Sequence, residues 1–134
     1  MKVQEETIAL FDQDKLYVIE YLQSRKITNK ELFDIINKLP FGLLEETSFF
    51  VGNEEYGISH FLSKSDVVGY DIRKVNTLLG TESIGIVAFA IVIGDDALCY
   101  DIRSEEVFLW MIQTDSGNRL HVSDNLTMFL SSLN

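Results

Sequence analysis

Three apolar runs separated by two short polar segments constrain the fold of this chain more than any other feature. They lie between Ile84 and Ile112 and read IGIVAFAIVI, ALCYDI and VFLWMI, with GDD and RSEE between them. Runs rich in β-branched and aromatic residues are typical of strands, and short turn-forming connections join antiparallel neighbours. The stretch therefore predicts a three-stranded antiparallel meander at the centre of a sheet.

Two helices and a hairpin are expected before the meander. Residues 5–24 carry apolar side chains at helical spacing. Thr28 begins a capping box with Glu31, and the helix that follows ends at Pro40. Residues 47–62 then predict a β-hairpin.

In the second strand of this hairpin, simple alternation places Tyr56, Ile58 and His60 on one face. Residues 71–79 predict a short helix with Gly80 as its C-cap.

After the meander, residues 114–119 form a loop and residues 120–122 a short strand. Ser123 or Asp124 caps a final amphipathic helix. The order of elements lacks β-α-β alternation. We therefore expect an α+β fold, a mostly antiparallel β-sheet with helices at the N-terminus and C-terminus packed on it.

Composition fits one domain spanning residues 1–134. The chain has 134 residues, of which 46% are hydrophobic and 24% charged, and it holds one proline and eight glycines. These values are those of an ordinary globular protein, large enough to bury its own core.

The chain is strongly acidic. Its formal net charge is −10, from 21 acidic and 11 basic residues. Nucleic acids and anionic membranes are bound through basic surfaces, so we expect neither as a partner. An acidic surface favours steering toward a basic protein.

Cys99 is the one cysteine, so no internal disulfide can form, and its strand position predicts a small buried hydrophobe. Acidic residues stand near the N-terminus where a signal peptide would need apolar ones. The longest apolar run, Ile84 to Ile93, is about half a membrane span. We therefore expect a cytoplasmic protein.

The segment Gly94-Asp95-Asp96 has two interpretations. Adjacent carboxylates at a hairpin tip can bind Mg²⁺, as in palm-type polymerases. That use needs a further carboxylate and basic residues for the substrate, which suits a short acidic chain poorly. Gly and Asp also tolerate positive φ, which favours a plain hairpin turn.

No other motif indicates catalysis. His60 and His121 lie in separate strands, and no cysteine or carboxylate stands near either at a metal-ligand spacing. We expect no catalytic residues, no metal and no cofactor. Trp110 lies in a strand that is apolar on both faces, so it is either a core residue or part of a platform that binds a partner.

The run from Gly94 to Ile112 resembles the C-terminal signature of the SUKH superfamily, the Smi–Knr group. The shared features are a Gly/Asp turn, a strand that ends in Asp101, and a Val-aromatic strand that carries Trp110. The terminal helix around Phe129 is also similar. Leu39-Pro40 looks like the family's Leu-Pro, whereas its Asn-Gly-Gly element is missing here.

The resemblance implies an α+β domain without enzymatic activity. Many bacterial members are immunity proteins that bind and neutralise a toxin, often a nuclease. A net charge of −10 is compatible with this role, because the active site of a nuclease is basic. A basic toxin domain is therefore the expected partner.

The expected contacts are acidic residues of the meander turns with two aromatic anchors: Asp95, Asp96, Tyr100, Asp101, Glu105, Glu106 and Trp110. Two alternatives stay open. One is a regulatory or scaffold protein of the same fold, which could form a homodimer. The other is a metal-dependent enzyme that uses Asp95 and Asp96.

Overall fold

The computed structural model of the chain describes residues 2–3, 15–38, 44–45, 47–67, 69–111 and 119–133. Residues 5–14 of the first expected helix, the Leu39-Pro40 stop and residues 114–118 of the expected loop lie outside these ranges.

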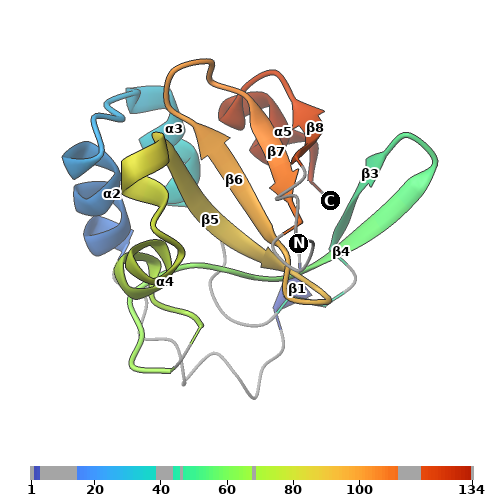
Figure 1. The fold of residues 1–134 in the computed structure, drawn as a ribbon, viewed down its shortest axis with the longest axis horizontal. Coiled ribbons are helices and arrows are strands. Elements are labelled where there is room, and N and C mark those ends of the chain that lie inside the picture. The colour runs from blue at the N-terminus through green and yellow to red at the C-terminus, as the bar shows by residue number, and fades with distance from the viewer. Residues whose placement is uncertain are drawn as a thin grey trace.

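A six-stranded antiparallel sheet organises the described part, and its strands follow one another in chain order (Figure 1). They are β3 (Ser48–Val51), β4 (Glu54–Phe61), β5 (Ile86–Val92), β6 (Ala97–Asp101), β7 (Val107–Trp110) and β8 (Arg119–Ser123). The expected meander is β5–β6–β7, and it occupies the middle of the sheet. The sheet curls into a near-barrel, because its edge strands β3 and β8 approach each other. A separate two-stranded pair, β1 (Lys2–Val3) and β2 (Leu44–Glu45), was not expected from the sequence.

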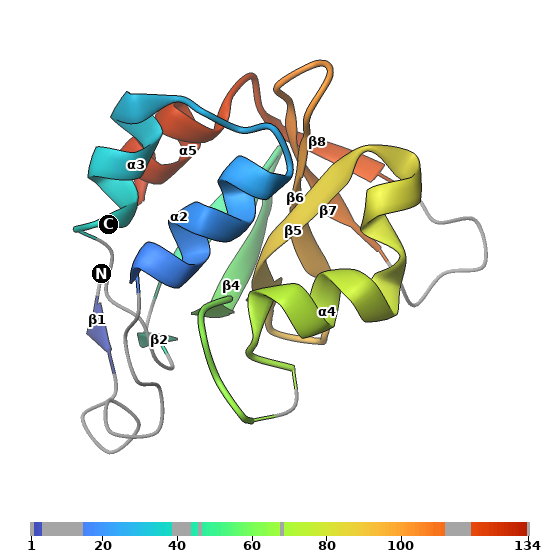
Figure 2. The same ribbon diagram turned by 90° about the vertical axis from the view of Figure 1, so that its left-hand side faces the viewer.

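Helices cover one face of this sheet. They are α2 (Lys15–Ser24), α3 (Lys30–Ile36) and α5 (Leu126–Ser132), and Figure 2 shows them on the same side. Helix α4 (Ile72–Leu79) and the 3-10 helix η1 (Thr81–Ile84) lie beside β5. The expected α+β class, with N- and C-terminal helices on an antiparallel sheet, is confirmed.

The pairing register sorts the sheet residues into two faces. The helix-covered face carries two rows, one of Ala90, Leu98, Leu109 and Leu120, the other of Val87, Tyr100 and Val107. The opposite face, here called the outer face, carries Ile91, Ala97, Trp110 and Arg119, followed by Ala88, Cys99, Phe108 and His121. Both faces of the meander are largely buried, which explains why its strands read as continuous apolar runs.

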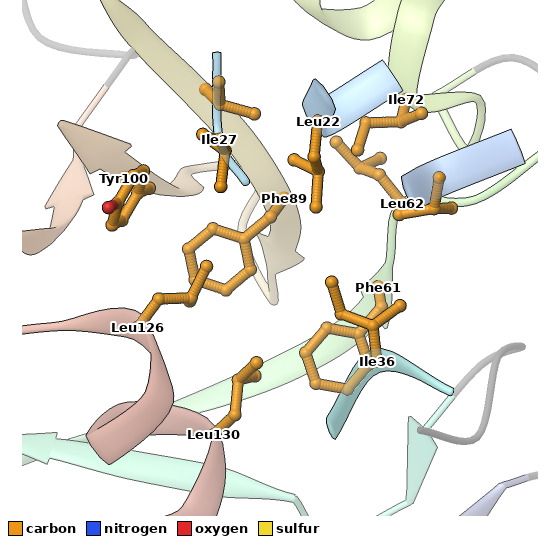
Figure 3. Close-up of a pocket in the computed structure, with 12 residues that line it drawn as sticks. Leu22, Ile27, Ile36, Phe61, Leu62, Ile72, Phe89, Tyr100, Leu126 and Leu130 are labelled. Carbon is orange, nitrogen blue, oxygen red and sulfur yellow. The ribbon is translucent and has the colours of Figure 1, made fainter. Parts of the chain in front are cut away.

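The helices close over a small apolar cavity of about 30 Å³ (Figure 3). Leu22 of α2 and Leu130 of α5 meet Phe61, Phe89 and Tyr100 of the sheet around it. A void this small with an apolar lining stays dry and holds no ligand. It is a packing gap in the core.

Strand β4 departs from the expected alternation. Its register shifts between Ile58 and His60, because Ile58 pairs with Val92 but His60 pairs with Ile91. Neighbours in β5 point to opposite faces, so Ile58 and His60 do as well. The expectation that they share a face is wrong, because Ser59 forms a β-bulge.

Two of the expected helix caps are also wrong, and in each case an asparagine takes the position. Asn29 caps α3 by accepting a hydrogen bond from the Leu32 N–H, in place of Thr28. Asn125 caps α5 in the same way. Asn caps a helix as well as Ser, Thr or Asp does. The residue type alone therefore could not identify which of several neighbouring residues is the N-cap. The Gly80 C-cap of α4 is confirmed, in the left-handed conformation.

A side chain replaces a missing strand at the edge of β5. Strand β4 leaves β5 after Phe61, so the backbone of Ala88 has no strand partner on that side. The buried Asn76 carboxamide takes this place. Its Oδ1 accepts from the Ala88 N–H at 2.8 Å, and its Nδ2 donates to the Ala88 carbonyl at 2.9 Å. The side chain thus satisfies both backbone groups as a neighbouring strand would.

Arg25 and Thr81 continue this arrangement toward the start of β5. The Arg25 guanidinium donates to the Ile86 carbonyl at 2.6 Å, and the Thr81 hydroxyl donates to Asn76 Oδ1 at 2.7 Å. Arg25, Asn76 and Thr81 are all buried. Together they fix α2, α4 and η1 against the edge of β5.

We expect Asn76→Ala to lower the free energy of unfolding by about 3 kcal/mol, since it leaves two buried backbone groups of Ala88 without partners. Urea denaturation followed by circular dichroism measures the change. Asn37→Ala, at an exposed position, is the matched control and should cost below about 0.5 kcal/mol. Equal losses in both variants would contradict the role given to Asn76.

The C-terminal end of α2 holds a strained residue. Lys26 has φ of 68°, while the Ile27 N–H bonds to the Leu22 carbonyl and the Lys26 N–H to that of Gln23. This is a Schellman motif, in which glycine is the usual residue at the left-handed position. The motif forms here despite a side chain that disfavours it.

Lys26→Gly should therefore raise the free energy of unfolding by about 0.5–1 kcal/mol, because glycine adopts positive φ without steric cost. Thermal and urea denaturation test this expectation. The same substitution inside α4, Lys74→Gly, should instead destabilise the fold by about 1 kcal/mol.

Candidate functional site

The structure separates the acidic residues that the sequence analysis grouped together. Asp95 and Asp96 lie in the β5–β6 turn, whereas Asp101, Glu105 and Glu106 lie around the β6–β7 turn. Figure 1 shows these turns at opposite ends of the meander. Since β6 has five residues, the turns are roughly 15 Å apart. The five acids do not form one patch.

The carboxylates around the β6–β7 turn are engaged inside the protein. Asp101 Oδ1 accepts from the Arg103 and Ser104 N–H groups, and its Oδ2 forms a 3.1 Å ion pair with Arg119. Glu106 Oε2 lies 2.7 Å from His121 Nδ1. These contacts join the turn to β8 and leave little of this charge for a partner.

The pKa of Asp101 reflects this engagement. Burial by itself would raise that pKa. Hydrogen bonds from the Ser104 N–H, the Arg119 guanidinium and the Arg103 N–H outweigh burial and hold the pKa of Asp101 below its ordinary value. The carboxylate is therefore a fixed structural anion that shapes its turn. Glu105, beside it, is exposed and has φ of 66°.

The β5–β6 turn has the backbone that the sequence predicted. Gly94 and Asp95 have φ of 104° and 72°, and the Val92 N–H donates to the Asp96 carbonyl at 2.8 Å. The hairpin-turn interpretation of Gly-Asp-Asp is thus confirmed. Within the described ranges, no three His, Cys, Asp or Glu side chains come together as a metal site. Asp95 and Asp96 therefore gain no third ligand from that part of the chain.

The β3–β4 hairpin adds two acids that sequence reasoning did not assign to the site. Exposed Glu54 and Glu55 stand at the start of β4, two to three residues before Gly57, whose carbonyl accepts from the Ile93 N–H beside the β5–β6 turn. Within β4, the Tyr56 hydroxyl donates to Glu54 Oε2 at 2.8 Å. That hydrogen bond, with burial and the charges of Glu54 and Asp96, raises the pKa of Tyr56.

We call Glu54, Glu55, Asp95 and Asp96 the acidic corner. None of the four forms an ion pair with a lysine, arginine or histidine of the described residues. The signal that could have found the corner is the register of β4 against β5, because it places residue 57 beside residue 93.

Two exposed apolar side chains accompany the acidic corner. Phe50 pairs with Glu55 on β3 and is 61% exposed. Ile93 is 73% exposed and lies over Gly57, where a β-carbon would come within 2.7 Å of Ile93 Cδ1. Gly57 thus makes room for Ile93 on the outer face. Large exposed apolar side chains ringed by charge are typical of a protein-binding surface.

The two expected aromatic anchors differ in position. Tyr100 is 8% exposed and lines the core cavity (Figure 3), so the expectation that it meets a partner is wrong for the folded chain. Burial, with the charges of Glu105 and Asp101, raises the pKa of Tyr100. Trp110 is half-buried on the outer face, beside Ala97 at the same end as Asp95.

Cys99 and His60 are buried beneath the outer face. Burial raises the pKa of the Cys99 thiol, so the residue is the inert small hydrophobe that the sequence predicted. The His60 ring lies 2.9 Å from Ser59 Oγ and 3.0 Å from the Gly69 carbonyl, and packs on Tyr70. Burial lowers the pKa of His60, although the Gly69 carbonyl and Asp95 favour its charged form.

The lowered pKa of His60 makes stability depend on pH. Between the unfolded value of 6.5 and the lower folded value, the unfolded chain binds more protons. The free energy of unfolding should therefore fall as the pH drops from about 7 to 5, by at most about 1.4 kcal/mol per pH unit from this group. Urea titrations at several pH values measure the slope. His60→Gln should flatten it, and a slope that persists in this variant would assign it elsewhere.

Comparisons of the chain with protein-family models, with curated proteins and with solved structures found no match. The resemblance to the SUKH superfamily therefore stays a prediction. Among the helices of the described ranges, none combines the length and the apolar character needed to cross a bilayer.

Proposed function

We propose that this chain is a non-enzymatic, cytoplasmic binding protein that neutralises a basic protein toxin. The observation that carries the proposal is the acidic corner, in which four carboxylates without ion-pair partners in the described chain flank exposed Phe50 and Ile93. The acidic corner would supply charge, and the two apolar side chains would supply the buried centre of the interface.

Charge complementarity favours a cationic partner. With a formal net charge of −10, the protein repels other anions and attracts a basic surface over several ångströms. The catalytic face of a nuclease is basic, because it binds phosphate groups. The resemblance of the meander to immunity proteins of the SUKH superfamily supports the same partner class.

The proposed contact set differs from the one expected from the sequence. Asp95 and Asp96 stay in it, Glu54 and Glu55 join it, and Tyr100 leaves it because its ring is buried. Asp101 and Glu106 at the opposite turn are assigned to structure, because both already pair with β8. Glu105 is exposed at that turn but lies outside the acidic corner, so it is not in the contact set. Trp110 remains a peripheral contact on the outer face.

The proposal predicts that removing the charge of the acidic corner abolishes toxin binding. In the test variant, Glu54 and Glu55 become Gln while Asp95 and Asp96 become Asn, which also tolerates the positive φ of Asp95. Affinity for toxin domains encoded next to this gene should fall about 100-fold at low salt, as measured by calorimetry.

The matched control neutralises four exposed acids elsewhere: Glu20, Glu31, Asp34 and Asp66. This variant carries the same net charge, so it should keep nearly all of the affinity if binding is local to the corner. Equal losses in both variants would show general charge steering only, and unchanged binding in the first would exclude this surface. Phe50→Ala should separately weaken binding about tenfold.

A second candidate is a scaffold protein that forms a homodimer through β3. This strand is an edge of the sheet and presents Phe50 to solvent, which is the arrangement that edge-to-edge pairing uses. Sedimentation equilibrium distinguishes the scaffold protein from the toxin-binding protein. If the protein is strictly monomeric and still binds the toxin, the homodimer is excluded.

A further inference from the structure

A cleft lies at the opposite end of β5 from the acidic corner. Two cationic side chains, Arg25 and Arg73, line it. It has a volume of about 580 Å³ and opens between the C-terminal end of α2, α4 and η1. Tyr21, Ser24, Arg25, Arg73, Thr77 and Glu82 are among the residues that line it. Its volume falls within the range of small-molecule sites, about 300–1,000 Å³.

Arg25 at the wall of this cleft is a buried cation with no counter-ion among the residues that the structure describes. It is 8% exposed, and its guanidinium donates only to neutral groups. These are the Tyr21 hydroxyl at 2.8 Å, the Thr81 hydroxyl at 3.3 Å, and the carbonyls of Thr81 and Ile86 at 3.4 and 2.6 Å. Within the described chain, its Nε–H donates to no residue and no carboxylate pairs with it.

Structural demands account for only part of this arrangement. The carbonyls of Thr81 and Ile86 and the hydroxyls of Tyr21 and Thr81 need N–H donors, but none of these four acceptors carries a charge that requires a cation. A buried charge is costly unless it is paired, so an arginine with no carboxylate partner among the described residues points to an anion from outside.

Arg73 brings a second cation to the same place. Its guanidinium carbon lies 5.2 Å from the centre of the Tyr21 ring, and that of Arg25 lies 5.8 Å from the same ring. The Arg73 guanidinium carbon also lies 5.1 Å from the centre of the Tyr17 ring. Two cations that line one cleft repel each other, and an anion bound between them would offset that repulsion. No ion pair of Arg73 occurs among the described residues.

We propose that this cleft binds a phosphate group carried by a small molecule, held by Arg25 and Arg73. Two guanidinium groups match the near-dianionic charge of a phosphate. The Nη atoms of Arg25 are engaged inside the protein, so its Nε–H and the exposed guanidinium of Arg73 would be the donors to the phosphate oxygens. The cleft is much larger than a phosphate ion alone, which favours a phosphate ester. Glu82 lines the rim and weakens binding through repulsion, so it tunes the affinity of the site.

The test uses the full chain, with inorganic phosphate and glycerol phosphate as separate probes at constant ionic strength set by sodium chloride. In ¹⁵N NMR spectra, the Nε–H signal of Arg25 should shift and saturate with each probe. Tighter binding of glycerol phosphate would identify an ester as the natural ligand, and equal binding would identify free phosphate. An Arg25 signal that responds to neither probe would overturn the proposal.

Variants on exposed residues keep the test independent of folding. Arg73→Gln should weaken phosphate binding about tenfold. Lys74→Gln makes the same charge change one residue away, outside the lining of this cleft, and should leave the affinity unchanged. Glu82→Gln should raise the affinity several-fold. Equal effects of Arg73→Gln and Lys74→Gln would show nonspecific charge attraction and overturn the site.

Discussion

The fold depends on the hydrogen bonds that complete one backbone edge of strand β5, at Ala88. At the start of β5, strand β4 has already departed, and the backbone of Ala88 would be buried without partners. The Asn76 carboxamide supplies both a donor and an acceptor there. Because Asn76 belongs to α4 and also bonds to Thr81, this one side chain fixes the position of the whole segment that connects β4 to β5. The backbone N–H and C=O groups of a buried strand edge need hydrogen-bond partners, and here a side chain of helix α4 supplies them.

The two ends of the meander show how the same residue type serves different purposes. Around the β6–β7 turn, Asp101 accepts backbone N–H groups, and Asp101 and Glu106 pair with side chains of β8, so these two carboxylates hold the turn in place. At the acidic corner, the hydroxyls of Tyr56 and Ser48 donate to Glu54 and Glu55, whereas Asp96 Oδ1 is buried without a hydrogen-bond partner among the described residues. Composition alone cannot separate these classes, because both ends are equally acidic in sequence. Pairing geometry separates them.

Much of the fold could be predicted from the sequence, since it depends on local patterns. Apolar runs and turn residues fixed the meander, and Asp71 with Gly80 bounded α4. The caps of α3 and α5 could not be chosen, because several neighbouring residues cap a helix equally well. The bulge at Ser59 and the acidic corner depend on the register between strands that are far apart in sequence. For the same reason, Tyr100 looked like a surface residue although the helices bury it.

The order of the strands has a consequence for how the chain reaches its native state. Each strand pairs with its neighbour in sequence, so most pairings close only a short loop and cost little chain entropy. Within the six-stranded sheet, the exception is β4 with β5, whose connection spans residues 62–85 and contains α4 and η1. Formation of α4 shortens this connection before the strands meet. We therefore expect the hairpins to form first, then α4, and the pairing of β4 with β5 last.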